Sequence, residues 1–396
     1  MAMLLSGGLL FDGDGNLREG QGVLIEGDRI TKVAPTEDFA GFDGQRVDTS
    51  GGTVLPGLFD CHVHLCMNAS GDVAAAMNKM SDAQITMLAL ENAQTILRGG
   101  VTSVRDCGGK DFLEFAVRDA INARKFQGPT IHAAGKMICM TGGHGNRIGR
   151  VADGKEEVIK AVREQVHAGC DCVKIMATGG VGTPGVNPED AHYSPEEMAA
   201  GIHEALRFHK HTASHAQGRD GILNAVRGGI DSIEHGIFMD DRCIEEMKEA
   251  GTWLVATMAA PRHILENPDA VPPHVIEKTK RVSVFHNGAI KKFYDAGGKM
   301  AMGTDTGTPF NIHGNNAMEL AYMAGIGIAP IDALQAATGN SADLVRDEER
   351  GRIKEGMYAD ILIVNGNPAD DINMAADKSN HRAVLKYGEL AAGSLN

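Results

Sequence analysis

The strongest constraint on the fold is an alternation that runs through residues 58–347. Short apolar runs are separated by longer segments with helical periodicity, such as SPEEMAAGIHEALRFHKH (194–211). Eight such runs occur, namely LFDCHVHL (58–65), VTSVRDCGG (101–109), PTIHAAG (129–135), CDCVKIMATGG (170–180), HTASHAQG (211–218), DSIEHGI (231–237), TWLVATMAA (252–260) and KMAMGTDTG (299–307). Eight strands alternating with helices predict an α/β fold of the (β/α)8 TIM barrel type, with a doubly wound open sheet as the alternative.

The polar residues of these runs favour the barrel. Because the carboxyl ends of all strands in a barrel meet at one mouth, side chains there come together, whereas an open sheet spreads them along an edge. Six metal-competent side chains stand near the ends of five runs: His62, His64, Lys174, His215, His235 and Asp305.

Both ends of the chain have a β pattern. GVLIEGDRITKVA (22–34) predicts a hairpin that turns at Gly27 and Asp28, and GRIKEGMYADILIVNGNP (351–368) alternates in the same way. We therefore expect residues 1–57 plus 348–396 to form one small β-sandwich domain beside a barrel of residues 58–347.

Charge and apolar content exclude several classes of function. The net charge of −14 argues against a nucleic-acid-binding surface, which needs a basic patch. No stretch reaches the roughly 18 apolar residues that a membrane span requires, and the first residues predict a strand rather than a signal peptide. Seven cysteines without paired spacing indicate free thiols in a reducing cytoplasm.

The first motif, His62-Val63-His64, is suited to metal binding. Residues two apart on a strand face the same side, so both imidazoles point into the barrel, where they can bind a borderline divalent metal or serve as core histidines. Lys174 ends another apolar strand. A buried ammonium is costly, so this lysine either pairs with a carboxylate, becomes an anionic ligand by carboxylation with CO2, or faces outward.

The other three candidates carry little information one by one. His215 and His235, each followed by small residues, also suit core positions, and Asp305 between glycines also suits an Asx turn. The joint order of H-x-H, Lys, His, His and Asp is much more specific than any single motif.

In that order the chain resembles the amidohydrolase superfamily. The matching stretches are FDCHVHL, VKIMATGG, SHAQG, IEHG and MGTDTG, with GGTVLPGLFD before them and GRIKEGMYADILIVNGNP after them. VTSVRDCGG, TGGHG (141–145) and KIMATGGVGTPGV followed by HYSPEEM (192–198) are most similar to the Xaa-Pro dipeptidase (prolidase) and imidazolonepropionase-like branch. Imidazolonepropionases lack the lysine, so Lys174 favours the dipeptidase side.

The resemblance implies a pair of divalent metal ions, with zinc favoured by the ligand types. The first two histidines and Asp305 would bind the more buried ion, His215 and His235 would bind the second, and N6-carboxylated Lys174 would bridge them. A hydroxide shared by both metals would attack an amide carbonyl.

The resemblance also suggests roles around the metals. Asp305 would carry the proton of the hydroxide to the leaving amine. His144 in TGGHG would stabilise the tetrahedral intermediate, unless it is an ordinary loop histidine. Tyr193 would bind the carboxylate of the substrate through its hydroxyl, helped by the backbone N–H groups around Gly180 and Val181, unless Tyr193 is a hydrophobic staple ahead of the next helix.

The predicted function is cleavage of a dipeptide (Xaa-Pro or similar) or an N-acyl amino acid by a cytoplasmic binuclear metallopeptidase. A cyclic amide or carbamate hydrolase and a heterocycle deaminase are alternatives with the same site, and a non-catalytic binding protein is a third class. Arg105 and Asp106 either support the metal site or form a structural ion pair. The resemblance implies a homo-oligomer with a small-molecule substrate, while the net charge and the lack of long apolar stretches argue against nucleic-acid and membrane partners.

Overall fold

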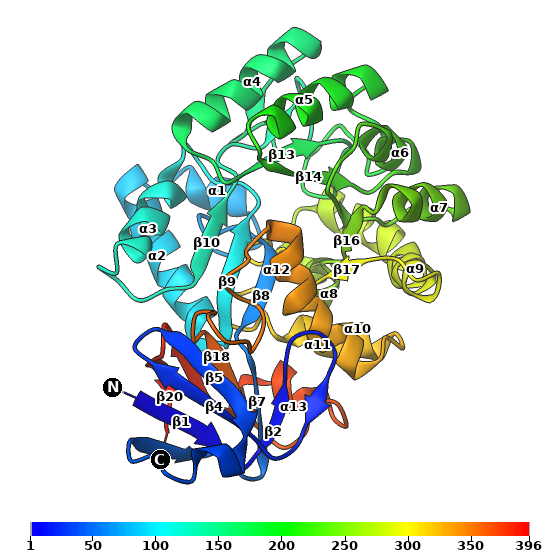
Figure 1. The fold of residues 1–396 in the computed structure, drawn as a ribbon. Helices are drawn as coiled ribbons and strands as arrows, with labels where there is room; N and C mark the ends of the chain where they lie inside the picture. Colours follow the sequence, from blue (N-terminus) through cyan, green and yellow to red (C-terminus); the bar gives the residue numbers. More distant parts are fainter. Residues whose placement is uncertain (1, 396) are drawn as a thin grey trace.

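The computed structural model describes residues 2–395 and has a mixed α/β fold with parallel strands at its centre (Figure 1). Each of the eight predicted apolar runs contains one parallel strand. These strands are β8 (Leu58–Val63), β9 (Val101–Asp106), β10 (Thr130–Ala133), β13 (Cys172–Met176), β14 (His211–Ala216), β15 (Ser232–His235), β16 (Trp253–Val255) and β17 (Met300–Ala301). The parallel α/β fold expected from the alternation is confirmed.

The central strands form two sheets, and the smaller one contacts the larger one at both of its edge strands, β8 and β10. One sheet has the order β10-β9-β8, and the other has the order β12-β11-β13-β14-β15-β16-β17, including the short strands β11 (Ile138–Cys139) and β12 (Arg150–Val151). At one junction the Cys61 N–H donates to the Met302 carbonyl (2.8 Å), and at the other the Asp171 N–H donates to the Ala133 carbonyl (2.8 Å). Contacts at both edges are what a (β/α)8 barrel requires.

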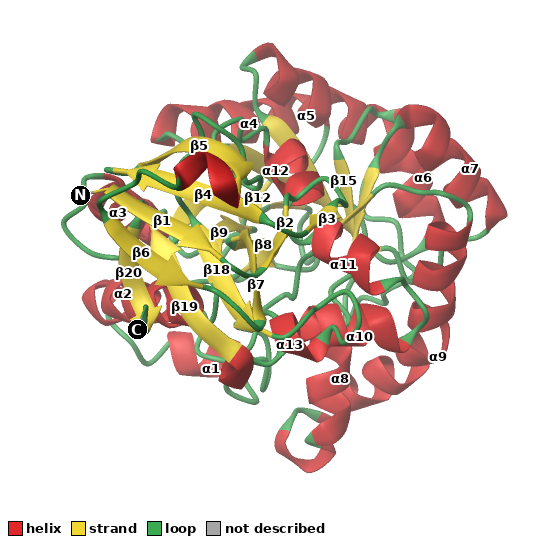
Figure 2. Cartoon of the chain, turned by 60° about the horizontal axis from the view of Figure 1, so that its bottom comes forward, coloured by secondary structure: helices red, strands yellow, loops and turns green. Residues whose placement is uncertain are grey.

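Helices surround these strands (Figure 2). α2 and α5 begin at capping boxes, Ser81 with Gln84 and Ser194 with Glu197, in which each serine and its partner satisfy exposed N–H groups of the first turn. The helices are α1 (Val73–Met77), α2 (Asp82–Arg98), α3 (Leu113–Asn122), α4 (Lys155–Ala168), α5 (Pro195–Arg207), α6 (Arg219–Arg227), α7 (Asp241–Ala250), α8 (Ala259–Glu266), α9 (Pro273–Asp295), α10 (Met318–Gly325), α11 (Pro330–Ala336), α12 (Gly339–Val345) and α13 (Asn373–Ala376).

Strands from both ends of the chain lie together, as Figure 1 shows in blue and red. One sheet has the order β5-β4-β1-β6 and the other the order β20-β19-β18-β7-β2-β3. These strands are β1 (Ala2–Ser6), β2 (Leu9–Phe11), β3 (Leu17–Arg18), β4 (Gln21–Glu26), β5 (Arg29–Pro35), β6 (Gln45–Asp48), β7 (Gly52–Pro56), β18 (Ile361–Asn365), β19 (His381–Lys386) and β20 (Glu389–Gly393). The predicted hairpin turn at Gly27 and Asp28 joins β4 to β5.

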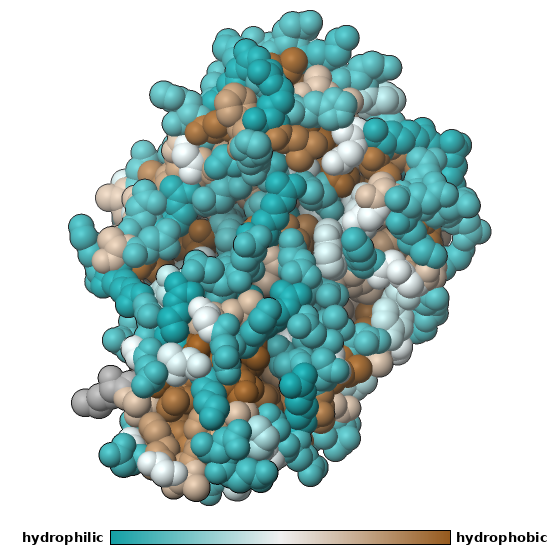
Figure 3. Space-filling view, viewed as in Figure 1, coloured by the Kyte–Doolittle hydropathy of each residue, from teal (hydrophilic) through white to brown (hydrophobic). Residues whose placement is uncertain are grey.

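Apolar side chains from the two terminal sheets share one core, in which Leu5 and Ile25 join Ile361 and Leu385. The domain boundaries at residues 57 and 348 stay a prediction. Hydrophilic residues cover much of the face seen in Figure 3. All seven cysteines are free and buried, as expected. Between residues 2 and 395, none of the helices combines the length and apolar character needed to cross a membrane.

Candidate active site

The six polar residues singled out from the sequence line a single cavity of about 280 Å³. They come from the carboxyl ends of β8, β13, β14 and β15 and from the segment after β17. Two of them have left-handed backbone, with φ of 74° at His235 and 60° at Asp305. Such conformations cost about 1–3 kcal/mol each and persist where the surroundings enforce them, often at functional sites.

The first two histidines converge on Asp305. The Asp305 carboxylate lies 3.5 Å from His62 Nε2 and 3.2 Å from His64 Nε2. The two imidazole rings are 5.4 Å apart, centre to centre. Two ring nitrogens and a carboxylate oxygen thus face one point, as ligands of a divalent metal do.

The second histidine pair lies beside the first. His235 Nε2 is 2.9 Å from His215 Nδ1, and the His235 ring lies 5.2 Å from the His62 ring. Ligand atoms of His62, His235 and Asp305 all lie within 4.8 Å of one another. The donor atoms of both pairs therefore belong to one continuous cluster.

The other nitrogen of each imidazole is held by a partner outside the cluster, which fixes the orientation of the ring. This arrangement is characteristic of metal-binding histidines. The pairs are His62 Nδ1 with Glu234 (2.8 Å), His64 Nδ1 with the Gly108 carbonyl (2.8 Å), His215 Nε2 with the Gly179 carbonyl (3.0 Å) and His235 Nδ1 with the Thr257 hydroxyl (2.6 Å).

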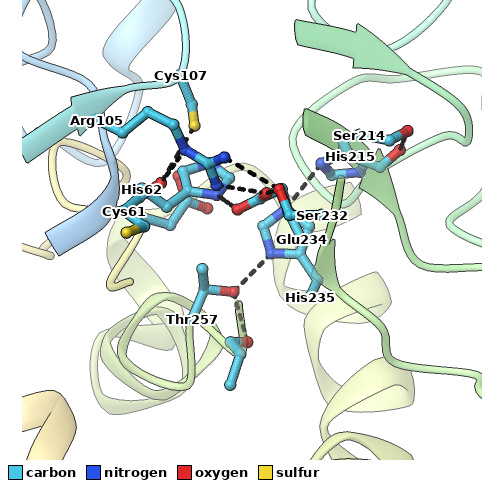
Figure 4. A network of polar contacts seen from close by, with 12 residues as sticks. Cys61, His62, Arg105, Cys107, Ser214, His215, Ser232, Glu234, His235 and Thr257 are labelled. Carbon is cyan, nitrogen blue, oxygen red and sulfur yellow. Dashed lines mark hydrogen bonds and ion pairs between the residues drawn. The ribbon is translucent and has the colours of Figure 1, made fainter. Parts of the chain in front are cut away.

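The Glu234 carboxylate belongs to a buried network behind the site (Figure 4). Arg105, which is fully buried, donates to Glu234 (2.7 Å), to the Ser232 hydroxyl (3.0 Å) and to the Cys61 carbonyl (2.7 Å). Arg105 therefore supports His62 through Glu234, a residue that sequence reasoning missed although IEHG contains it.

Asp106 has a separate role. Its carboxylate accepts the N–H groups of Leu65 (2.8 Å), which follows His64, and of Gly108 (2.9 Å), whose carbonyl contacts His64. The ion pair between Arg105 and Asp106 that we considered from the sequence is not formed, because Arg105 is bound to Glu234 instead.

Burial sets the charge state of most of the imidazoles. Loss of solvent, reinforced by neighbouring positive groups, holds the pKa of His62, His215 and His235 well below the usual value. Burial alone would also lower the pKa of His64, but the Asp305 carboxylate beside it outweighs this and raises the pKa. Three of the rings are thus neutral, which is the form that binds metals.

Lys174 is 2% exposed and lines the same cavity, so the outward-facing alternative is wrong. Among residues 2–395, no hydrogen bond or ion pair satisfies its amine. A buried amine without a partner is costly, which fits a group that binds something else.

His144 also lines the cavity, and its ring lies 4.4 Å from that of His215. Burial lowers its pKa to about 3, so the ring is neutral. Its Nδ1 lies 2.8 Å from the Thr183 hydroxyl. Val181 lines the cavity, whereas Gly180 packs against the His144 ring and is not part of the cavity wall; the predicted role of their backbone N–H groups stays a prediction.

Tyr193 requires a correction. It is 2% exposed and outside the cavity wall, and its hydroxyl donates to the Ala152 carbonyl (2.8 Å). The predicted contact with a substrate carboxylate is therefore wrong. Tyr193 precedes α5 and packs in the hydrophobic core, in keeping with the structural alternative.

The remaining cavity wall is mainly apolar, with methionine, valine, isoleucine and proline side chains. Arg147, which sequence reasoning missed, is exposed at this wall and has no ion pair or hydrogen bond with another of residues 2–395. The cavity thus combines an apolar wall, an available guanidinium and a polar cluster.

Comparison with known proteins agrees with this geometry. Residues 53–391 match the model of the amidohydrolase family. Ochratoxinase of Aspergillus niger is 30% identical, with 98% of this chain and 86% of that protein covered. Imidazolonepropionase of Micrococcus luteus is 26% identical over 260 residues, which make up 61% of this chain and 62% of that protein.

Solved structures give the same result. A Xaa-Pro dipeptidase with methionine bound in its active site superimposes with a TM-score of 0.91 at 32% identity, covering 98% of this chain and 99% of the other. A prolidase in complex with N-methylphosphonate-L-proline has a TM-score of 0.89 at 30% identity, with 98% and 99% covered. The resemblance inferred from the motifs is confirmed, and the chain belongs to the amidohydrolase family.

Proposed function

We propose that this protein is a binuclear metal-dependent hydrolase that cleaves the amide bond of a dipeptide or an N-acyl amino acid. The observation that carries the proposal is the gathering of four imidazoles, the Asp305 carboxylate and the unpartnered amine of Lys174 on one buried cavity. Membership of the amidohydrolase family supports hydrolysis of an amide bond.

The donor set fits two divalent cations, with zinc favoured by the imidazoles. His62, His64 and Asp305 would hold one, and His215 and His235 would hold the other. When bound, such a pair supplies a water that is nucleophilic at neutral pH and withdraws electrons from the substrate carbonyl.

The surroundings of Lys174 support its carboxylation. After the ammonium loses one proton, the amine can add to CO2 and release a second proton, giving an anionic carbamate. This change removes a buried positive charge and creates oxygen donors between the two histidine pairs. It therefore resolves the cost of an amine that has no carboxylate partner.

Side chains around the cluster would do the rest. The Asp305 carboxylate, in contact with His64, can accept a proton and return it to the leaving nitrogen. His144 is neutral and can donate a hydrogen bond to the oxygen that becomes negative.

We assign the carboxylate of the leaving amino acid to Arg147 in place of Tyr193. A guanidinium binds a carboxylate through two parallel hydrogen bonds, and Arg147 is free to do so. The apolar wall suits an apolar acyl group or side chain. Similarity to a Xaa-Pro dipeptidase and to an ochratoxinase supports substrates of this class.

The test is a substrate screen on metal-loaded enzyme together with metal analysis. Dipeptides, N-acyl amino acids, cyclic amides and aminated heterocycles are compared by the release of amino acid or ammonia. We expect about two metals per chain and release of a free amino acid. One metal per chain with release of ammonia would instead identify a deaminase.

A further inference from the structure

The contact between His144 and Thr183 joins two loops that both line the cavity. His144 lies between β11 and β12, and Thr183 lies in the loop after β13, 39 residues further along the chain. Thr183 Oγ1 is 2.8 Å from His144 Nδ1. The Thr183 hydroxyl can therefore donate to Nδ1, which is the nitrogen without a proton in an imidazole that donates through Nε2.

Neutral imidazole has one N–H group and one lone pair, so the two nitrogens have opposite roles. A hydroxyl that donates to Nδ1 leaves the proton on Nε2. Only this tautomer lets Nε2 donate to a substrate oxygen. Without such a partner the proton can occupy either nitrogen, and the ring can rotate.

The position of the ring is also restricted by Gly180. A Cβ atom at Gly180 would lie 2.6 Å from His144 Nε2 and 2.7–2.8 Å from the adjacent ring carbons. Because real Cβ atoms essentially never make contacts below 3.0 Å, the ring can occupy this position only because residue 180 has no side chain. Gly180 therefore supplies space for His144 rather than a wall of the cavity.

Helix α9 holds Thr183 in place. The Lys278 ammonium donates to the Thr183 carbonyl (2.7 Å) and the Val186 carbonyl (2.6 Å). Arg281 forms an ion pair with Glu189 in the same loop (2.8 Å). The loop is thus fixed to the helix at several points around the residue that contacts His144.

We propose that Thr183 is a positioning residue that sets the tautomer and orientation of His144, so that Nε2–H points to the reacting carbonyl. This inference rests on the proposed role of His144. Lys278 acts one step further away by fixing the backbone of Thr183, and Gly180 allows the ring to occupy its place.

The test compares Thr183→Val, which keeps the shape and removes the hydroxyl, with Thr183→Ser, which keeps the hydroxyl. Loss of a whole oxyanion donor costs about 10²–10³-fold in kcat, so loss of its positioning should cost about 10-fold or more. We expect this fall in kcat for Thr183→Val, with KM and metal content unchanged and with kcat near wild type in Thr183→Ser. The Kd for an N-methylphosphonate analogue of the substrate should rise in parallel with the fall in kcat.

A double-variant cycle with His144→Asn separates the possible outcomes. If Thr183 acts through His144, adding Thr183→Val to His144→Asn causes no further loss. An equal loss in both backgrounds, or an equal loss in the valine and serine variants, overturns the inference while leaving His144 in its role. Unchanged kcat in His144→Asn alone overturns the role of His144 and, with it, the inference.

Discussion

Replacing Arg105 by methionine should destabilise the protein strongly, although Arg105 does not line the cavity. Arg105 and Glu234 are both fully buried, and their charged atoms are 2.7 Å apart. In Arg105→Met the methionine fills similar volume, but among residues 2–395 the Glu234 carboxylate keeps only the Ser232 hydroxyl and His62 as partners. The variant thus leaves a negative charge buried without its counter-ion.

The magnitude follows from the burial of the pair. Removing one partner of a buried ion pair costs about 3–5 kcal/mol, because the remaining charge is neither solvated nor paired. Replacing both partners by neutral groups of similar volume is much less costly. The double variant Arg105→Met, Glu234→Gln should therefore recover most of the lost stability.

The assay is urea unfolding of the metal-free proteins, followed by the fluorescence of the single tryptophan, Trp253 on β16, and by circular dichroism. Metal affinity is measured separately by competition with a chelating dye. We expect the double variant to remain about 10–100-fold weaker in metal binding, the usual effect of losing a partner behind a ligand. A wild-type unfolding midpoint for Arg105→Met, or no recovery in the double variant, would refute the reasoning.

Three further changes test other parts of the site. Lys174→Ala should lose most of its turnover and more than about 100-fold in metal affinity, which exceeds the usual effect of losing a residue that only supports a metal ligand. A variant that keeps two metals and normal turnover contradicts the bridging role. Arg147→Met should raise KM about 10–100-fold for substrates with a free carboxylate, because this factor corresponds to the free energy of a charged hydrogen bond. KM for the corresponding carboxamides should not change, and equal effects on both kinds of substrate exclude carboxylate binding. Tyr193→Phe should leave KM unchanged and lower the unfolding free energy by about 0.5–1.5 kcal/mol, and a raised KM would restore Tyr193 to the substrate site.

The sequence was sufficient to predict the strands and the six residues that meet at the cavity. Each of these residues stands at the end of an apolar strand and has a side chain that is costly to bury. The alternation of side chains along a strand predicts which neighbouring residues lie on the same face. His62 and His64, two residues apart, follow this rule, and both contact Asp305.

Glu234 could not be predicted in this way. Adjacent residues on a strand point to opposite faces, so alternation directs Glu234 away from the face that carries His235. The left-handed backbone at His235, with φ of 74°, breaks the alternation at the strand end. Glu234 can then contact His62 while His235 contacts His215. A sequence does not reveal which non-glycine residue adopts such a conformation.

Tyr193 and Arg147 show a second limit. Both lie in loops, where neither periodicity nor residue type determines the direction of a side chain. The tyrosine hydroxyl is used by the Ala152 carbonyl, whereas the arginine has no partner among residues 2–395 and lines the cavity. Their roles depend on contacts between segments that are distant in sequence.

The glycine- and proline-rich loop of residues 179–193 is tied to the histidine cluster of the proposed metal site. Its Gly179 carbonyl accepts from His215 Nε2 and so orients the ring whose Nδ1 faces His235. If the loop opened at Gly179, the His215 ring would lose this partner. Metal binding to His215 Nδ1 would favour the proton on Nε2 and so strengthen the contact with the Gly179 carbonyl. Metal occupancy and order of this loop should therefore change together, with the ties to α9 limiting how far the loop can move.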